Sequence, residues 1–185
     1  EPVENAELVR QLLAQSTELL ERPELAEHDT RRERAFVLLE MGHTASRTDF
    51  GAARRRYEQS LALYRAVGDR QGEGNTLAAL GSVILDSGNQ TLAGKYSKDA
   101  LAIWRSLGNR KKEASSLNAW GLTVSDYALK RDAGEEALEI FKAIGDRWGQ
   151  CQMYNNLSLL YGHLGLYNTA RDYARRAVEM VRPMG

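Results

Sequence analysis

The chain has 185 residues, of which 25 are basic and 25 acidic, so its formal net charge is zero. A nucleic-acid-binding domain carries a basic excess or stripe, which is missing here, so we predict no nucleic-acid partner. Hydrophobic residues make up 43% of the sequence, which provides a core and excludes an intrinsically disordered chain.

Two features of the sequence indicate the cellular compartment: it has a single cysteine, and it lacks a long apolar segment. Cys151 is alone, which excludes an internal disulfide and fits a reducing compartment. No apolar run approaches the roughly 18 residues of a membrane span, and no signal peptide opens the chain. We therefore predict a cytoplasmic protein without membrane contact. Because position 1 is Glu and a repeat pattern is already under way near residue 12, we expect a fragment of a longer protein.

Apolar residues recur at the spacing of α-helices along the whole chain, which contains only three prolines. Pro23 stops the first helix, and residues 23–29 are predicted as a loop. In chain order, about nine helices are predicted at 4–22, 29–47, 50–67, 70–87, 90–107, 110–124, 127–144, 147–164 and 167–182.

One phrase of ten residues occurs three times, at 61–70, 101–110 and 138–147, with offsets of 40 and 37 residues. In its first copy, Gly68 is suited to end a helix in a left-handed conformation, and Asp69 is suited to cap the next helix. A fixed period in this range indicates a solenoid, whose units bury apolar faces only against their neighbours. Because solenoids display long concave surfaces, we expect binding rather than catalysis.

The repeats divide a single array, 1–185, into units. After an incomplete leading repeat at 1–28, full repeats are predicted at 29–68, 69–108, 109–145 and 146–185, the last including a C-terminal cap. The third is three residues short between Gly121 and Asp126, so its first helix should lose nearly one turn. Lys130 and Gly134 then replace an Ala and an aromatic residue, and we expect either looser packing or a shift in superhelix curvature there.

The units share a Leu-Gly-like pair in the first helix, a tight turn, and a pattern of a small residue, an aromatic residue and Ala-Leu in the second helix. The pairs are Met41-Gly42, Leu80-Gly81, Trp120-Gly121 and Leu157-Ser158. In the second full unit these residues are Leu77, Leu80, Gly81, Ile84, Ala93, Ala100 and Leu101. The pattern resembles the tetratricopeptide repeat over about residues 33–182. The longer period is similar to kinesin light chain repeats and, still more, to the C-terminal arrays of bacterial STAND signalling ATPases and MalT-like regulators. The 19 Arg against 6 Lys are compatible with a bacterial source.

The resemblance implies an all-α, right-handed superhelical solenoid of antiparallel helix pairs, whose first helices line a concave face. The residues transferred to that face by register are Phe36, Leu39, His43, Arg47, Asn75, Ala78, Ser82, Asp86, Ser115, Asn118, Leu122, Gln152, Asn155, Leu159 and His163. Asn118 and Asn155 are equivalent, and an amide there can hold a peptide backbone by donating and accepting together. The alternative is a solvated side chain or a hydrogen bond between helices.

Chemistry beyond binding has little support in the sequence. His28, His43 and His163 lie on different units, and neither a zinc-type spacing nor a CxxC motif occurs, so we predict no metal, cofactor or catalytic residue. The equivalent aromatic residues Tyr64, Trp104 and Phe141 are interpreted as core between repeats.

Two hypotheses follow. The first is a non-enzymatic binding or sensor module of a larger signalling protein, whose concave face binds a peptide, a protein partner or a small effector. The alternative is a scaffold array that self-associates through an uncapped N-terminal end, or packs on its own protein, with no free ligand.

Overall fold

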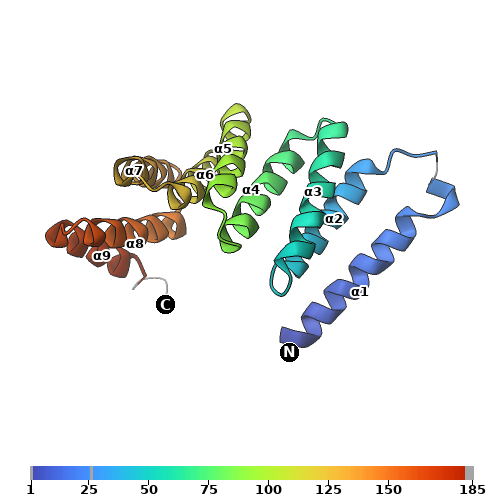
Figure 1. Ribbon diagram of the computed structural model, residues 1–185, viewed down its shortest axis with the longest axis horizontal. Helices are drawn as coiled ribbons and strands as arrows, with labels where there is room; N and C mark the ends of the chain where they lie inside the picture. Colours follow the sequence, from blue (N-terminus) through green and yellow to red (C-terminus); the bar gives the residue numbers. More distant parts are fainter. Residues whose placement is uncertain (1, 26, 182–185) are drawn as a thin grey trace. The chain divides into compact units, whose positions relative to one another are not determined.

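The computed structural model describes residues 2–25 and 27–181, with side chains from residue 7 onward, and contains nine α-helices within these ranges (Figure 1). They are α1 Pro2–Leu20, α2 Arg31–Ala45, α3 Phe50–Ala66, α4 Arg70–Asp86, α5 Gln90–Ser106, α6 Arg110–Thr123, α7 Tyr127–Ala143, α8 Arg147–His163 and α9 Tyr167–Val181. Every described helix end lies within two residues of its prediction, and the all-α class of paired helices is confirmed. The predicted end of the last helix, residue 182, lies outside the described residues.

The predicted loop at 23–29 needs one correction. Pro23–Leu25 forms a short 3-10 helix, η1, in which the Leu25 N–H donates to the Arg22 carbonyl at 3.0 Å. Proline stops α1, as expected, but the chain coils once more before α2 begins.

The corners between repeats follow the predicted capping chemistry. Gly68 has φ 69°, and the Asp69 N–H donates to the Tyr64 carbonyl at 3.0 Å, which closes the end of α3. The Asp69 carboxylate then accepts from the Gly72 N–H at 2.8 Å and caps α4. The same bonds recur at the next two copies of the phrase, through Asn109 to Lys112 and through Asp146 to Gly149.

The shortened repeat changes one helix and leaves one small gap. Helix α6 has 14 residues where α4 and α8 have 17, so the predicted loss of nearly one turn is confirmed. A Cβ on Gly134 would lie 3.0 Å from Leu157, whose side chain takes up much of the space that a larger residue would need. The expected looser packing is therefore limited to a cavity of about 50 Å³ beside Gly134.

The chain divides into two compact units, which meet within α5 at residues 100 and 101. In the first unit, α1 packs on α2, α2 on α3, and α3 on α4. Its buried apolar residues are Ala35, Val37, Leu39, Ala53, Tyr57, Leu61, Tyr64, Leu77, Leu80, Val83, Ile84, Ala93 and Ala100. None of the described α1 side chains, residues 7–20, is fully buried.

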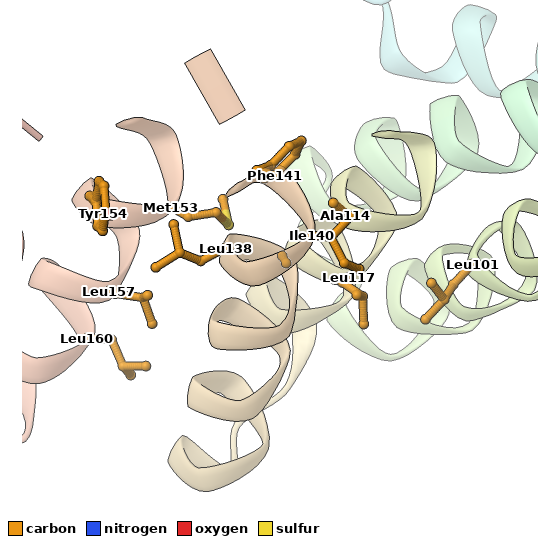
Figure 2. Packing of buried hydrophobic residues seen from close by; sticks show 11 residues of the cluster. Leu101, Ala114, Leu117, Leu138, Ile140, Phe141, Met153, Tyr154, Leu157 and Leu160 are labelled. Atoms are coloured by element: carbon orange, nitrogen blue, oxygen red, sulfur yellow. The ribbon is translucent and has the colours of Figure 1, made fainter. Parts of the chain in front are cut away.

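The second unit has its own core, drawn from the end of α5 and from α6, α7 and α8 (Figure 2). Its members are Leu101, Ala114, Leu117, Ala137, Leu138, Ile140, Phe141, Met153, Tyr154, Leu157 and Leu160. Helix α9 covers one side of it with half-buried side chains such as Tyr173 and Met180. The predicted core role of the aromatic residues is confirmed, because Tyr64, Trp104 and Phe141 are at most 5% exposed.

Within the described ranges, none of the helices is long and apolar enough to cross a membrane. The same residues contain no group of three or more His, Cys, Asp or Glu side chains arranged to hold a metal ion.

Candidate functional site

We call α2, α4, α6 and α8 the first-type helices, because each opens a repeat, and α1, α3, α5, α7 and α9 the second-type helices. All fifteen predicted concave-face residues lie on first-type helices or in the corners that follow them. Twelve are exposed and Asn75 and Asn118 are half-buried. Their role in binding stays a prediction.

Leu39 is the exception, because it is only 5% exposed and belongs to the core of the first unit. Assigning it to an open binding face was wrong. Leu39 is buried because its side chain is large and apolar, and burying a leucine side chain stabilises the fold by about 1.5–3 kcal/mol. At the same register, Ala78 is too short to reach the core and Asn155 is polar, and both stay exposed.

A cavity of about 640 Å³ in the first unit is lined by residues of α1, α2, the end of α3 and the start of α4. We call it the α1 pocket. Its lining residues are Ser16, Leu19, Leu20, Arg32, Glu33, Phe36, Val37, Tyr64, Asp69, Gln71, Gly72 and Asn75. The structure thus brings together two predicted residues, Phe36 and Asn75, and the exposed fraction of Phe36 is 55%.

Sequence reasoning missed the other lining residues, although part of the signal was present. Arg32 and Gln71 precede Phe36 and Asn75 by one helical turn, so extending the predicted rows toward the helix starts would have found them. The contribution of α1 carried no such signal, because none of the three copies of the recurring phrase lies in α1.

One wall of the α1 pocket is fixed by Asp69. Its carboxylate caps α4 and also accepts from Arg32 Nε at 2.8 Å, which ties the start of α2 to the start of α4. Burial raises the pKa of the Tyr64 hydroxyl, and the charge of Asp69 raises it further. Tyr64 therefore stays neutral beside the ion pair.

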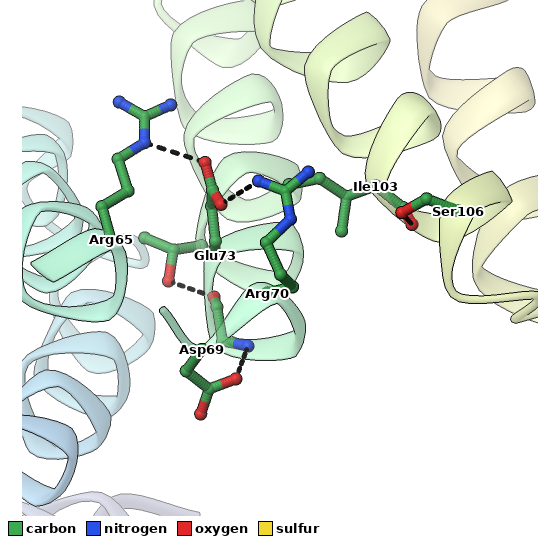
Figure 3. Close-up of polar contacts among 8 residues, drawn as sticks. Arg65, Asp69, Arg70, Glu73, Ile103 and Ser106 are labelled. Atoms are coloured by element: carbon green, nitrogen blue, oxygen red, sulfur yellow. Dashed lines mark hydrogen bonds and ion pairs between the residues drawn. The ribbon is translucent and has the colours of Figure 1, made fainter. Parts of the chain in front are cut away.

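The adjoining corner is held by a second ion-pair group. The Glu73 side chain is 9% exposed, and it accepts from Arg65 Nε at 2.8 Å and from Arg70 Nη1 (Figure 3). In the second unit, Arg105 and Arg110 bind Glu113 in the same way. Because these arginines come from both sides of each turn, they fix the angle between a second-type helix and the first-type helix after it.

The pocket owes its space to the lack of aromatic side chains on α1. The α1 side chains that approach α2 are Leu13, Ser16, Thr17 and Leu20, all half-buried. Their register equivalents on α3 are Tyr57, Ser60, Leu61 and Tyr64, all fully buried. On α3, the rings of Tyr57 and Tyr64 fill the equivalent space. Helix α1 has no aromatic residue at either position. Two further cavities, of about 560 and 350 Å³, also lie along α1, and the larger of them shares Leu20 and Val37 with the α1 pocket.

Elsewhere on the first unit, one of the predicted binding residues, His43, already contacts another side chain of the protein. The Tyr57 hydroxyl and His43 Nδ1 lie 2.9 Å apart, and burial raises the Tyr57 pKa. His43 is therefore held by its own repeat. The other predicted residues of this unit that stay exposed outside the pocket are Arg47, Ala78, Ser82 and Asp86.

In the second unit, Asn118 and Asn155 were predicted to be equivalent, but their surroundings differ. Asn156 Nδ2 donates to Asn118 Oδ1 at 2.9 Å, which is a hydrogen bond between α8 and α6. Asn118 thus follows the alternative of an inter-helix bond, whereas Asn155 stays exposed. Leu122 and Leu159, 48% and 59% exposed, place apolar surface beside them. The remaining predicted residues of this unit, Ser115, Gln152 and His163, are exposed.

No family model matches the sequence, and no curated protein matches it. Solved structures do resemble it. BtubC (BKLC) from P. vanneervenii has a TM-score of 0.85 at 19% identity, over 95% of this chain and 74% of that one. A Rap protein complexed with competence and sporulation factor has a TM-score of 0.77 at 16% identity, over 95% and 50% of the two chains.

A STAND protein with a tetratricopeptide repeat sensor, PH0952 from Pyrococcus horikoshii, has a TM-score of 0.78 at 22% identity. The match covers 98% of this chain and 29% of that one, so this chain spans less than a third of the STAND protein and half of the Rap protein. The class that the helices define is a repeat array of helix pairs. More particularly, this chain has the fold of a tetratricopeptide-repeat array.

Proposed function

We propose that this array is a non-enzymatic module that binds a peptide or protein segment along the exposed faces of its first-type helices. The observation that carries the proposal is the α1 pocket, whose volume lies in the range of ligand sites and whose wall includes Phe36 and Asn75. The names of two similar structures, a repeat sensor and a Rap protein complexed with a factor, support the same class of function.

The proposal extends to the setting of the module. It would serve as the sensor arm of a larger cytoplasmic signalling protein, reading a peptide, a protein or a small effector without contacting nucleic acid or membrane. The zero net charge and the single half-buried Cys151 support this setting.

The experiment is a selection from a random peptide library displayed on phage, using the whole chain as bait. Affinities of selected peptides are then measured by fluorescence anisotropy for the wild-type chain and four variants. Phe36→Ala and Asn75→Ala alter the first unit, Leu159→Ala alters the second, and Lys95→Ala on α5 is the control. We expect about tenfold weaker binding for at least one of the first three and no change for Lys95→Ala. Selected peptides that bind all four variants equally would refute the proposal, as would a selection that yields none.

A second candidate function, self-association, is favoured by one observation. Leu8, Leu12 and Leu19 lie along one side of α1, and each is 46% to 53% exposed. Such a stripe on a helix would be covered by a second copy. Light scattering should then give a mass that rises with concentration and falls back for Leu12→Glu; a constant monomer mass would exclude this candidate.

A further inference from the structure

We infer that the α1 pocket binds an aromatic side chain of an extended peptide that also carries a neighbouring Lys or Arg. This inference rests on the proposed function and names the sequence chemistry that its first unit would select. It follows from what fills the same space in the other corners and from the charges that line the pocket.

The aromatic requirement follows from the internal corners. Tyr64 packs so tightly under α4 that a Cβ on Gly72 would lie 2.3 Å from its ring, and Phe141 does the same at Gly149. Leu20 is the register equivalent of these aromatic residues, and it leaves a cavity of about 640 Å³. A ring entering from outside would occupy the space that α1 leaves empty.

The lining suits a ring in its chemistry as well as in its size. Leu19, Leu20, Phe36 and Val37 supply apolar wall from both α1 and α2. Phe36 is 55% exposed, so its ring is free to pack against an incoming one. Aromatic rings attract one another in offset-stacked and edge-to-face arrangements, beyond the effect of the area that they bury.

The basic requirement follows from charge. The pocket is lined by one cation, Arg32, and by two carboxylates, Glu33 and Asp69. Arg32 is already bound to Asp69. Among the described residues, Glu33 has no ion-pair or hydrogen-bond partner, so one negative charge is left over at the pocket wall. It stands at the register of Gly72 and Gly149, where Tyr64 and Phe141 leave no room for a side chain, and of Lys112, which lies over the Trp104 ring.

The backbone of the peptide also finds partners. Gln71 and Asn75 line the pocket, and within the described part of the chain neither side-chain amide makes a hydrogen bond. A side-chain amide can donate and accept at once, as a peptide group requires. Two such amides one turn apart on α4 suit an extended segment lying across the pocket mouth.

The test uses dye-labelled five-residue peptides and the whole chain. The probes are Gly-Phe-Lys-Gly-Ser, its charge-reversed form with Phe-Glu, and its truncated form with Ala-Lys. Fluorescence anisotropy should give tightest binding for Phe-Lys. Glu33→Lys should weaken Phe-Lys binding about fivefold and strengthen Phe-Glu binding by a similar factor.

A second variant places the ring inside the protein itself. Leu20→Tyr puts on α1 the aromatic residue of the internal corners, although Glu33 stands where Gly72 and Gly149 make room for those rings. The added ring should therefore project into the pocket and abolish binding of all three probes. Its matched control is Thr17→Leu, which lines the adjoining cavity and not the α1 pocket, so it should leave probe binding unchanged. Circular dichroism and the melting temperature establish that both variants are folded.

Three results would overturn the inference: no binding of Phe-Lys at millimolar concentration, equal binding of Phe-Lys and Phe-Glu, or unchanged binding by a folded Leu20→Tyr variant. Its failure is distinguishable from that of the proposed function. If library-selected peptides depend on Leu159 but not on Phe36, Asn75 or Leu20, the array binds peptides and this pocket does not select them.

Discussion

In the first unit, the corner between α1 and α2 and the corner between α3 and α4 are built from equivalent helices but differ in how well side chains fill them. Between α3 and α4, Tyr64 lies under Gly72 and is 5% exposed. Between α1 and α2, Leu20 takes the place of the tyrosine, Glu33 takes the place of the glycine, and a cavity remains. The difference indicates that Gly72 makes room for the Tyr64 ring, as Gly149 does for Phe141. The pairing is not general, because Lys112 stands at the glycine register opposite Trp104, with Nζ 5.8 Å from the ring centroid.

The largest effect should come from emptying the filled corner. Tyr64→Ala removes a buried ring and should lower the free energy of unfolding by about 3–5 kcal/mol. Leu20→Ala, in the open corner, should cost only about 1 kcal/mol because Leu20 is half-buried. Urea unfolding followed by circular dichroism measures both. Equal losses would mean that the two corners are packed equally well and that the comparison fails.

Adding a methyl group to the filled corner should have the next largest effect. Gly72→Ala puts a Cβ 2.3 Å from the Tyr64 ring, and we expect a net loss of about 1–2 kcal/mol despite the better helix propensity of alanine. The matched control is Gly162→Ala in α8, where a Cβ meets nothing within 4 Å. That variant should gain up to about 1 kcal/mol. A gain for both would show that the ring moves aside without cost.

Filling the open corner should be mildly stabilising. Thr17 lines the cavity of about 560 Å³ that adjoins the α1 pocket, and its equivalent on α3 is the buried Leu61. Thr17→Leu should raise the free energy of unfolding by about 0.5–1 kcal/mol. Glu18→Leu adds a similar side chain on an exposed position and should add nothing. If the two variants melt at the same temperature, cavity filling is not the cause.

The smallest effect concerns charge at the corresponding corner of the second unit. The Gly149 N–H, and then Lys111, lower the pKa of Asp146 below its ordinary value of 3.8. A carboxyl group with a lowered folded pKa adds stability above about pH 4, and this is lost as the pH falls through the folded pKa. Asp146→Asn keeps a cap, as Asn109 does, but loses the ion pair, at a cost of no more than about 0.5 kcal/mol.

Melting temperatures of the wild-type chain and Asp146→Asn between pH 7 and pH 3 measure this contribution. The two curves should differ at pH 7 and converge toward pH 3, and added salt should narrow the difference at pH 7. A constant offset across the range would point to capping rather than to charge.

The sequence predicted the corners well because their chemistry is local. A helix end such as Gly68-Asp69 needs only neighbouring residues, so its left-handed glycine and its cap could be recognised from the phrase itself. The shortening of α6 followed from a count of residues for the same reason.

The candidate site was less predictable because it depends on volumes and on pairings across helices. Register alone assigned Leu39 to the surface, although its size takes it into the core. It also made Asn118 and Asn155 equivalent, although only Asn118 accepts a hydrogen bond from Asn156. The α1 pocket was missed because it arises from a missing ring, and its wall combines residues as distant in sequence as Ser16 and Asn75.

The buried glutamates also have a consequence for how the chain folds. Arg65 and Glu73, like Arg105 and Glu113, are eight residues apart, so each ion pair closes a very short loop. Loop closure of this length costs little chain entropy, and topologies rich in local contacts fold fast. We therefore expect folding to start at either corner and to spread outward by adding neighbouring helices, with α1 joining last.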